Sequence, residues 1–427
     1  MEGGAGLARR IKWRIVVPTI LFMLLSSLDR VNISFAALRM NAELGFTPSQ
    51  YGFGAGILFL GFLAGQYPSV LLLQRFGMRR WLGATAILWG CSAGAMAFIH
   101  SHVEFYALRI LLGFAEGGLA PGIVVYLSRF ATERERATTF AMPMLAIPLS
   151  VIIGGPVSGW LMEQGLAGLS SWRWMFVAEA VPTVLLGIAA CFYFPDRPED
   201  AAWLSAQEKA WLERNAANRD IGPSRNDWSV LARPIVWTSA LLWFCLLSGA
   251  YGIMFWLPQM VKQMTDLSPL EIGFVNALPW LGVVVGIYFN SAHSDRTGER
   301  FWHVGLPAAL TGAAILAAAG LGAGPPGLFM LFLAGLGLGA AQGAFWALPT
   351  SLFTPATFAV GAVAINIAGS SGGLVIPHVI GIVRESSGGF GGPTLMIAAI
   401  MAAAALLVIL IRLWLFDSVR AAEAGGR

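Results

Sequence analysis

Apolar runs of about 20 residues recur along nearly the whole chain, and short links with glycine, proline or charge separate them. Coiled into a helix, a run of this length crosses the ~30 Å hydrocarbon layer of a membrane. The composition agrees, because 57% of the residues are hydrophobic and 12% are charged, whereas a soluble domain has about 45–50% and 25%. We therefore predict an all-α integral membrane protein with twelve transmembrane helices. The predicted spans are 14–38, 49–74, 81–99, 103–128, 138–162, 173–194, 234–260, 269–293, 302–322, 326–351, 356–383 and 391–416.

The distribution of positive charge predicts the orientation of these helices. Of the 27 Lys and Arg residues, 21 lie at the termini and in the alternate links that share a side with them. Four lie on the opposite side, and the other two, Arg30 and Arg109, fall inside predicted helices. Cytoplasmic segments of membrane proteins carry the excess of Lys and Arg. We therefore expect a multi-pass protein of the inner membrane with both termini in the cytoplasm.

The same distribution bears on partners and cofactors. The net charge of +4 reflects the cytoplasmic excess, and the sequence has no solvated basic domain to bind nucleic acid. Cys91, Cys191 and Cys245 lie in apolar runs, so they predict no disulfide framework, and the histidines form no metal-ligand cluster. The chain also lacks a G-x-x-x-x-G-K-[ST] loop for ATP. We expect a monomer without a cofactor, whose partners are the lipid bilayer and a small molecule driven by ion gradients.

Two sequence marks recur 221 residues apart. Thr47-Pro48 corresponds to Ser268-Pro269, and QRFGMR at 74–79 corresponds to DRTGER at 295–300. Six predicted helices separate the copies. Because six is an even number, the two halves must share one orientation, as in a parallel repeat.

Residues 195–233 form the only long link between predicted spans and are mixed in charge. The pattern Ser205-x-x-Glu208 predicts one short helix opened by a capping box. A regulatory or partner-binding role is the alternative to a plain connection. The predicted domains are a six-helix bundle at 1–194, a cytoplasmic linker at 195–233 and a second six-helix bundle at 234–427.

The D-R-x-G-x-R pattern between the second and third spans, repeated between the eighth and ninth, resembles the gate motif of the major facilitator superfamily. In that family the charges of the motif hold neighbouring helices together on the cytoplasmic side when the protein faces outward. Positive anchors flanking a tight turn would account for the arginines, but not for the two glycines at the same register. The first copy departs from the pattern at Gln74, where Asp is usual, and this implies a weaker gate. The implied gate residues are Arg75, Gly77, Arg79, Asp295, Arg296, Gly298 and Arg300.

Further segments are similar to the anion:cation symporter branch of this superfamily, which moves organic carboxylates with protons or occasionally sodium. The resemblance implies the major facilitator fold and import of a small organic anion by proton symport with alternating access, with sodium as the alternative coupling ion. The chain departs from the branch at Phe62, where many members have Tyr, and at Ser370, where Asn is common. The similar segments are LDRVNIS, RILLGFAEGGLAPG, PDRPEDAAWLSAQEKAWL, FWALPT and INIAGSSGGLVIP.

The resemblance also implies residues that line a substrate cavity. Trp346 and Asn366 match family positions that line it from the tenth and eleventh helices. A packed aromatic ring and an Asn bonded to a neighbouring helix are the alternatives. Gln66, in the second span, either faces the cavity or makes a polar contact between helices.

Four charged residues interrupt the apolar spans: Asp29 and Arg30 in the first, Arg109 and Glu116 in the fourth. At 1.5 Å per residue, Asp29 lies about 14 Å from the outer end of its helix and Glu116 lies near the bilayer midplane. Arg109 and Glu116 are seven residues apart and share one helix face. Gly113 and Gly117 allow another helix to approach closely. An ion facing lipid costs about 3 to more than 10 kcal/mol. These side chains therefore face one another or a wet cavity.

Two arginines in a buried cavity attract a carboxylate, which a guanidinium binds in a bidentate manner. We predict that Arg30 and Arg109 bind the substrate anion, with Arg109 partly occupied by Asp29. Glu116 has no certain cationic neighbour in the sequence and desolvation favours its neutral form, so we predict that it carries the coupled proton. Asp29 is the second candidate for proton coupling. The alternative, that Asp29 and Arg109 only fix helix packing, leaves Arg30 and Glu116 without a reason.

Three classes of function fit these features. A proton-driven transporter of organic anions accounts for the paired arginines, with a sugar acid, a tartrate-like acid or an aromatic acid as substrate. Another carrier of the same fold, such as a drug antiporter or a neutral-sugar carrier, is disfavoured by those arginines. An integral membrane enzyme would need a nucleophile or metal constellation, which the sequence does not show.

Overall fold

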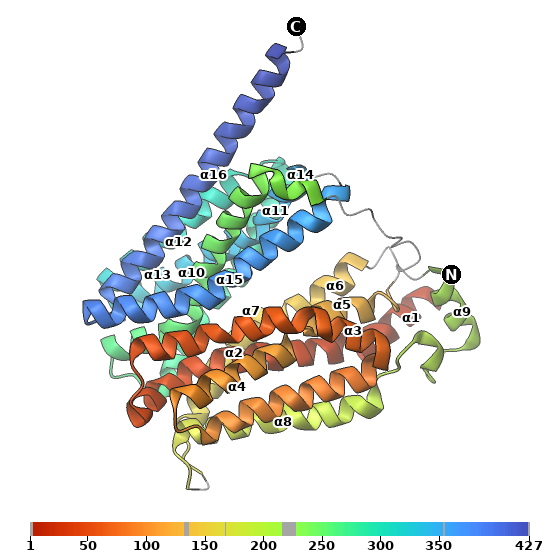
Figure 1. Ribbon diagram of the computed structural model, residues 1–427, viewed down its shortest axis with the longest axis horizontal. Coiled ribbons are helices and arrows are strands. Elements are labelled where there is room, and N and C mark those ends of the chain that lie inside the picture. The colour runs from red at the N-terminus through yellow and green to blue at the C-terminus, as the bar shows by residue number, and fades with distance from the viewer. Residues whose placement is uncertain (1–2, 132–135, 167, 216–227, 353–354, 426–427) are drawn as a thin grey trace. The chain divides into compact units, whose positions relative to one another are not determined.

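The computed structural model describes residues 3–131, 136–166, 168–215, 228–352 and 355–425. The regular elements in these ranges are helices, and no strand occurs among them (Figure 1). Within the described ranges, eleven helices are long and apolar enough to cross a membrane. One of them, Pro48–Phe98, is 51 residues long and contains both the second and the third predicted spans. The predicted all-α membrane fold is confirmed.

A glycine divides the longest helix. Helix α3 (Pro48–Ala95) has a kink at Gly77, where the backbone is not helical (φ 81°, ψ 173°). Residues with a Cβ rarely adopt this conformation, whereas glycine adopts it readily. Gly77 therefore separates the second span from the third, and the gate motif lies at this tight turn.

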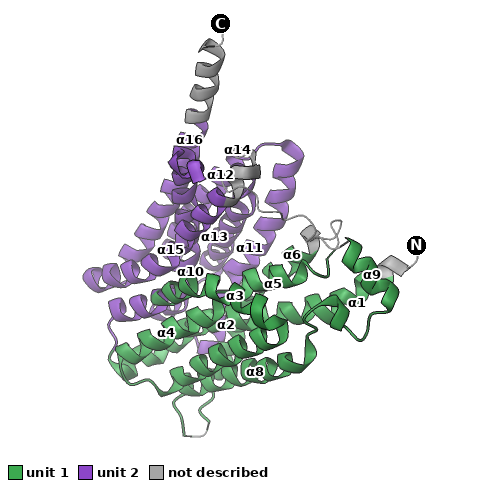
Figure 2. Cartoon of the chain, turned by 45° about the vertical axis from the view of Figure 1, so that its right-hand side comes forward, with its two compact units in different colours: residues 1–45, 57–222 green, residues 46–56, 223–427 purple. Residues whose placement is uncertain are grey.

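The described helices form two compact units (Figure 2). Unit 1 comprises residues 1–45 and 57–222. Within it, α2 packs against α7 and α8. Its helices are α1 (Gly3–Ile11), α2 (Val17–Leu44), residues 57–95 of α3, α4 (His102–Glu116), α5 (Leu119–Leu127), α6 (Arg136–Met144), α7 (Ala146–Leu161), α8 (Ser171–Tyr193) and α9 (Ala206–Asn215).

Unit 2 comprises residues 46–56 and 223–427. In this unit α13 packs against α11 and α12, and α10 packs against α15 and α16. Its helices are α10 (Pro234–Met264), α11 (Pro269–Thr297), α12 (Trp302–Leu321), α13 (Pro325–Phe345), α14 (Ala347–Leu352), α15 (Pro355–Ser387) and α16 (Gly391–Gly425).

The first turns of α3 belong to unit 2 because they pack closely against α15 and α10. A Cβ on Gly52 would lie 2.1 Å from the carbonyl oxygen of Pro377, so only glycine permits this approach. The Tyr51 hydroxyl donates a hydrogen bond to the carbonyl oxygen of Phe255 at 2.8 Å.

Helices α3 and α4 of unit 1 touch backbone to backbone. A Cβ on Gly113 would lie 2.0 Å from the carbonyl oxygen of Leu58, and one on Gly117 would lie 2.1 Å from that of Phe62. Gly61 on α3 makes the reciprocal approach to Ile110, at 2.1 Å. The close approach expected from the glycines at 113 and 117 is confirmed, and its partner is α3.

The same crossing occurs in unit 2. There α11 meets α13 through Gly282 and Gly286, which lie 221 residues after Gly61 and Gly65. Added Cβ atoms would lie 2.2 Å from the carbonyl oxygen of Phe332 at Gly282 and 2.1 Å from that of Leu336 at Gly286. Two equivalent glycine crossings at one offset agree with the predicted parallel repeat.

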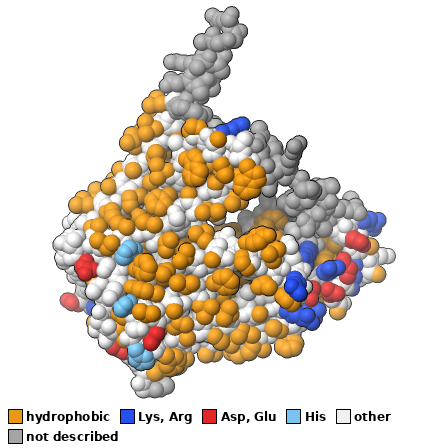
Figure 3. All heavy atoms as spheres, viewed as in Figure 1, with side chains coloured by type: hydrophobic (Ala, Val, Ile, Leu, Met, Phe, Trp, Pro, Cys, Tyr) orange, Lys and Arg blue, Asp and Glu red, His pale blue; other side chains and the backbone are white. Residues whose placement is uncertain are grey.

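The distribution of hydrophobic and charged side chains on the surface agrees with a membrane protein. Figure 3 shows hydrophobic side chains over the flanks of each unit and charged side chains gathered where α1 and α9 lie. At this charged end Arg10 forms an ion pair with Glu208. Glu208 also accepts the Ser205 backbone N–H at 2.9 Å while its own N–H donates to the Ser205 hydroxyl at 3.3 Å. The predicted capping box is therefore confirmed.

Candidate functional site: a buried charge cluster in unit 1

The centre of the site is an ion pair between α2 and α4. Arg30 Nε donates to Glu116 Oε2 at 3.0 Å, and the two side chains are 15% and 0% exposed. Arg30 Nη2 donates to the Ser26 hydroxyl at 3.1 Å, and the guanidinium carbon lies 5.1 Å from the centre of the Phe62 ring. Glu116, which has no certain cationic neighbour in the sequence, therefore has Arg30 as that neighbour in the structure.

Glycine packing explains how these groups meet. Gly117 fits against the backbone of Phe62, so the end of α4 and the Phe62 turn of α3 approach Arg30 from two helices. Helix α4 ends at Glu116, and α5 begins three residues later at Leu119. Glu116 thus lies at the junction of α4 and α5 within the fourth span, fully buried, with Oε1 lacking a hydrogen-bond partner.

Asp29 and Arg109 also meet, but at the backbone. Arg109 Nη1 lies 3.5 Å from the main-chain carbonyl oxygen of Asp29, and both residues are 1% exposed. The Asp29 carboxylate accepts from Asn32 Nδ2 at 3.3 Å through Oδ1, while Oδ2 has no partner. The four charges predicted from the sequence therefore form one buried cluster, whose ion pair joins Arg30 to Glu116.

The structure adds a fifth ionisable group, Glu179 on α8, which the sequence reasoning missed. Its carboxylate accepts from Asn32 Nδ2 at 2.9 Å and from the Ser158 hydroxyl at 2.7 Å. Glu179 is 6% exposed. The signal was present, because Glu179 is the one acidic residue in the apolar run 173–194, and an ionisable residue inside a span indicates function.

The cluster now holds three carboxyl groups and two guanidinium groups. The charges of Arg30, Arg109, Glu116 and Glu179 all act on the Asp29 carboxyl. In a low-dielectric interior such groups are stable only when paired or neutralised. An added carboxylate and an added proton therefore change the net charge of this cluster in opposite directions. The guanidinium groups can bind the carboxylate, and the carboxyl groups can bind the proton.

The other predicted substrate residues lie apart from this cluster along the chain. Gln66 is half-buried in unit 1, one turn beyond Phe62 and on the same face of α3. In unit 2, Trp346 is half-buried against Trp243, with ring centres 5.5 Å apart, and Asn366 is exposed on α15. In unit 1 a side-chain contact thus joins Arg30 to Glu116 and a side-chain-to-backbone contact joins Arg109 to Asp29, and Trp346 packs in an aromatic cluster of unit 2.

The first copy of the gate motif holds the start of the link that follows α8. Arg79 donates its backbone N–H to Asp196 Oδ1 at 3.0 Å, and its guanidinium donates to Oδ2 at 3.3 Å. A Cβ on Gly77 would lie 2.5 Å from the same carboxylate. Arg75 is exposed, with its guanidinium carbon 5.5 Å from the Phe76 ring. The predicted link at 195–233 therefore begins docked on unit 1.

Tyr126 of α5 and Arg129, in the turn that follows α5, strengthen this docking. Tyr126 donates its hydroxyl to the carbonyl oxygen of Pro195 at 2.9 Å. Arg129 donates to the carbonyl oxygen of Asp196 at 2.8 Å. Because these acceptors are backbone atoms, the two contacts fix the path of the chain at Pro195 and Asp196.

The second copy of the motif is closed on itself. Arg300 donates to Asp295 Oδ1 at 2.6 Å and to the Ser294 hydroxyl at 2.9 Å. Gly298 ends α11 in the left-handed conformation (φ 70°), and no atom lies within 4 Å of an added Cβ. Arg296 is exposed. The two copies share the glycine turn but differ in what their charges contact.

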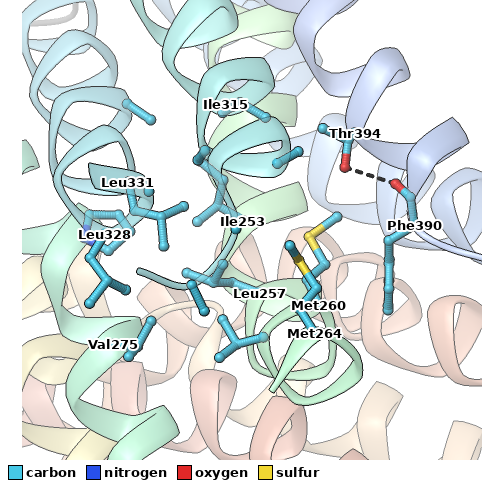
Figure 4. Close-up of a pocket in the computed structure, with 18 of the residues that line it drawn as sticks. Ile253, Leu257, Met260, Met264, Val275, Ile315, Leu328, Leu331, Phe390 and Thr394 are labelled. Carbon is cyan, nitrogen blue, oxygen red and sulfur yellow. Dashed lines mark hydrogen bonds between the residues drawn. The ribbon is translucent and has the colours of Figure 1, made fainter. Parts of the chain in front are cut away.

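Unit 2 contains an apolar cavity of ≈ 90 Å³. Figure 4 shows Leu257, Ile315 and Leu331 around it. The Thr394 hydroxyl is bound to the carbonyl oxygen of Phe390 at 2.8 Å (Figure 4). The residues that line the cavity carry no charge, so it lacks the cation that a carboxylate requires.

Comparisons with known proteins agree with this architecture. The sequence model described as "Major Facilitator Superfamily" matches residues 19–377. A protein of Agrobacterium vitis named "Putative tartrate transporter" is 40% identical over 417 residues, which are 95% of this chain and 91% of that protein. The "Quinolone resistance transporter" of Acinetobacter baumannii is 31% identical over 408 residues, 94% of each chain.

A solved structure shows the same fold. It is the crystal structure of a bacterial homologue of the human lysosomal transporter Spinster, in an inward-facing and occupied conformation. The alignment has a TM-score of 0.75 at 15% identity and covers 95% of this chain and 96% of that one. At this identity the likeness concerns the fold alone.

Proposed function

The chain belongs to the Major Facilitator Superfamily, and on that premise we propose that this membrane transporter imports a small organic anion together with a proton by alternating access. Tartrate is the first substrate to test, because the relative from Agrobacterium vitis, 40% identical, carries that acid in its name. Sugar acids and aromatic acids belong to the same chemical class. The family and the relatives are transporters, not enzymes.

The observation that carries the proposal is the ion pair of Arg30 with Glu116, at 3.0 Å and buried. A substrate carboxylate and the Glu116 carboxylate are alternative partners for one guanidinium. When Glu116 takes up a proton it loses its charge and releases Arg30, which then binds the substrate. Proton and anion thus bind together, as symport requires.

The buried pair also restrains the empty carrier. Removing one partner of a buried ion pair costs about 3–5 kcal/mol, because the other charge is left without compensation. An anion that arrives without a proton leaves Glu116 ionised and unpaired. A proton that arrives without an anion leaves Arg30 unpaired. Each ligand alone is therefore disfavoured, and the two together are not.

Arg109 supplies the second guanidinium, and Asp29 remains a candidate for proton coupling. Gln66, Trp346 and Asn366 complete the proposed substrate-binding set, with an aromatic surface and two amides for the hydroxyl groups of a sugar acid or tartrate. We assign a gating role to the two copies of the D-R-x-G-x-R motif. The Asp196 contact of Arg79 supports this role for the first copy, because it ties the motif to the link between halves.

We further propose that the carrier is a monomer with both termini and residues 195–233 in the cytoplasm. The excess of Lys and Arg at these segments supports this orientation. Reporter fusions at Arg427 and Asn215 test it: both should report the cytoplasm, and signals from opposite sides would overturn the topology.

A drug carrier is the second possibility, because the relative from Acinetobacter baumannii is named for quinolone resistance. One experiment separates the two. Purified protein in proteoliposomes should accumulate labelled tartrate or another carboxylate from a panel when the outside is made acidic. Carboxylates should also raise the melting temperature, since a ligand of the folded state stabilises it. Quinolone efflux without response to any carboxylate would overturn the organic-anion proposal.

A further inference from the structure

Glu179 on α8 has hydrogen bonds but no cation among the described residues. Its Oε1 accepts from the Ser158 hydroxyl at 2.7 Å and its Oε2 accepts from Asn32 Nδ2 at 2.9 Å. Both donors are neutral. By contrast, Glu116 has Arg30 at 3.0 Å. Of the buried carboxyl groups in the cluster, Glu179 is therefore one whose charge is not offset by direct contact.

The helices packed on α8 supply few other charges. Helix α7 carries no charged residue, and α3 meets α8 through Gly90 and Gly94. On α8 itself the other charged residue is Arg173, which pairs with Glu43 of α2 at 3.3 Å. Arg173 lies six residues from Glu179, about 9 Å along the helix. Among the described residues, the charged group that contacts connect to Glu179 is Asp29, which shares the Asn32 amide with it.

Asn32 connects Glu179 to the rest of the cluster. Its amide nitrogen donates both to Glu179, at 2.9 Å, and to Asp29 Oδ1, at 3.3 Å. Asn32 is 1% exposed, and its Oδ1 has no partner, like Asp29 Oδ2. This cluster has more buried acceptors than donors. An added proton would supply a donor where unpartnered acceptors already lie.

The charge balance gives the same answer. With every group ionised, three carboxylates exceed two guanidiniums by one negative charge. A bound dicarboxylate adds two more negative charges to a buried site. Protonation of Glu116 offsets one of them. Asp29 also lacks a direct ion pair, but the charges of Arg30 and Arg109 act on it, whereas Glu179 contacts neutral donors, so Glu179 is the carboxyl group that can best offset the other.

We propose that Glu179 is a second proton-binding residue of the transport cycle, coupled to Asp29 through the Asn32 amide, so that two protons accompany one dicarboxylate. One proton binds a Glu116 oxygen and the other a Glu179 oxygen on the outer side, and both leave to water with the anion on the inner side. The inference rests on the proposed proton-coupled function and assigns a residue that the family resemblance did not supply.

The test measures the number of protons per anion in proteoliposomes with the membrane potential clamped to zero. At zero net flux, the slope of the logarithm of the tartrate ratio against the pH difference equals that number. We expect a slope of two for the parent and of one for Glu179→Gln, which keeps the side-chain size and loses the proton. Glu179→Asp should restore the parent slope.

Two controls keep failures separate. Glu104→Gln makes the same change at an exposed acid of α4 and should leave the slope unchanged. Infrared spectra at neutral pH provide a readout without transport: the parent should show a protonated-carboxyl band that Glu179→Gln lacks. A parent that ignores the pH gradient refutes the proposed function. A parent that responds, with the same slope in Glu179→Gln, refutes the second proton site and leaves the proposed function standing.

Discussion

Arg30 and Glu116 stand 86 positions apart in the chain, and their side chains meet at 3.0 Å inside unit 1. The contact needs two conditions. Helix α4 must turn Glu116 toward α2, and α3 must lie close enough to place the Phe62 ring beside the same guanidinium. Because a carboxylate already occupies Arg30, an arriving anion must displace it, and the first two predictions follow from this competition.

Replacing Glu116 with Gln imitates the protonated residue at every pH. We expect Glu116→Gln to exchange labelled tartrate across a proteoliposome membrane but to accumulate less of it than the parent from the same proton gradient, because one of the two proposed proton sites is lost. Anion affinity of the parent should rise as pH falls, because protonation of Glu116 frees Arg30, whereas affinity of the variant should change less with pH. Gradient-driven accumulation at the parent level would remove Glu116 from the coupling mechanism and leave Asp29 and Glu179.

Replacing Arg30 with Lys keeps the charge but removes the planar fork that binds a carboxylate with two parallel hydrogen bonds. We expect tartrate affinity to fall by about tenfold or more, which corresponds to ~1.4 kcal/mol. Isothermal titration of protein that shows a parent-like melting profile measures this directly. If Arg30→Ala at normal abundance binds its anion as well as the parent does, the carboxylate clamp is wrong.

The sequence predicts the helices and the members of the site better than their pairing. A helix that crosses lipid needs a long apolar run, so the sequence predicts the spans. Charge is costly in lipid, so the charged residues inside the spans, Asp29, Arg30, Arg109 and Glu116, stand out as site candidates. Which charge meets which depends on the rotation of each helix about its axis. The sequence predicts how deep each charge lies along its helix but not how the helix is rotated. It therefore does not predict that Glu116 pairs with Arg30.

Glu179 shows a second limit. It enters the cluster through Asn32 because α2 packs on α8, and a single acid in an apolar run carries no mark of that neighbour. Asp196 is similar, since its contact with Arg79 spans 117 positions. The glycines are the opposite case. The sequence predicts their role at the α3–α4 crossing, because only a small residue allows two helices to touch by their backbones.

Gly113 tests whether that crossing positions the site. Its added Cβ would lie 2.0 Å from the backbone oxygen of Leu58, so α3 and α4 must move apart in Gly113→Ala. Overpacking of this kind costs about 1–3 kcal/mol, and we expect a lower melting temperature together with reduced tartrate uptake. Gly320→Ala on α12 is the matched control, because nothing lies within 4 Å of its Cβ. Equal stability of the two variants would contradict the close packing.

Gly77 and Gly298 occupy the same position in the two copies of the gate motif. Comparing alanine at the two positions distinguishes the cost of backbone strain from the cost of a steric clash. Both have positive φ, 81° and 70°, so alanine is strained at each, at about 1–3 kcal/mol. Only at Gly77 does the added Cβ meet a carboxylate, that of Asp196 at 2.5 Å. We expect Gly77→Ala to lower the melting temperature more than Gly298→Ala does. The reverse order would show that Asp196 does not dock at this turn.

Asp196 itself should matter less for stability. Its partner Arg79 is 43% exposed, and an exposed ion pair is worth about 0–1 kcal/mol. Asp196→Asn removes the charge and leaves the backbone contacts of Tyr126 and Arg129 in place. We expect a change in melting temperature smaller than that of Gly77→Ala, and a thermal-denaturation series measures both together.

The last prediction concerns pH and a group outside the spans, Glu299 between α11 and α12. Burial acts to raise its pKa, but hydrogen bonds from the Trp302 backbone N–H, at 2.9 and 3.0 Å, and from His303, at 2.9 Å, outweigh it and lower the pKa below its ordinary 4.5. A lowered folded-state pKa means that the ionised form stabilises the fold. That contribution is fully present above the ordinary value and is lost as the pH falls through the folded-state value. Glu299→Gln should therefore melt below the parent at neutral pH, and the gap should close as the solution is acidified through the lowered pKa of Glu299. Glu213→Gln, at an exposed site on α9, controls for the loss of a carboxylate, and a gap in Glu299→Gln that does not shrink on acidification would mean that the Glu299 charge contributes nothing to the fold.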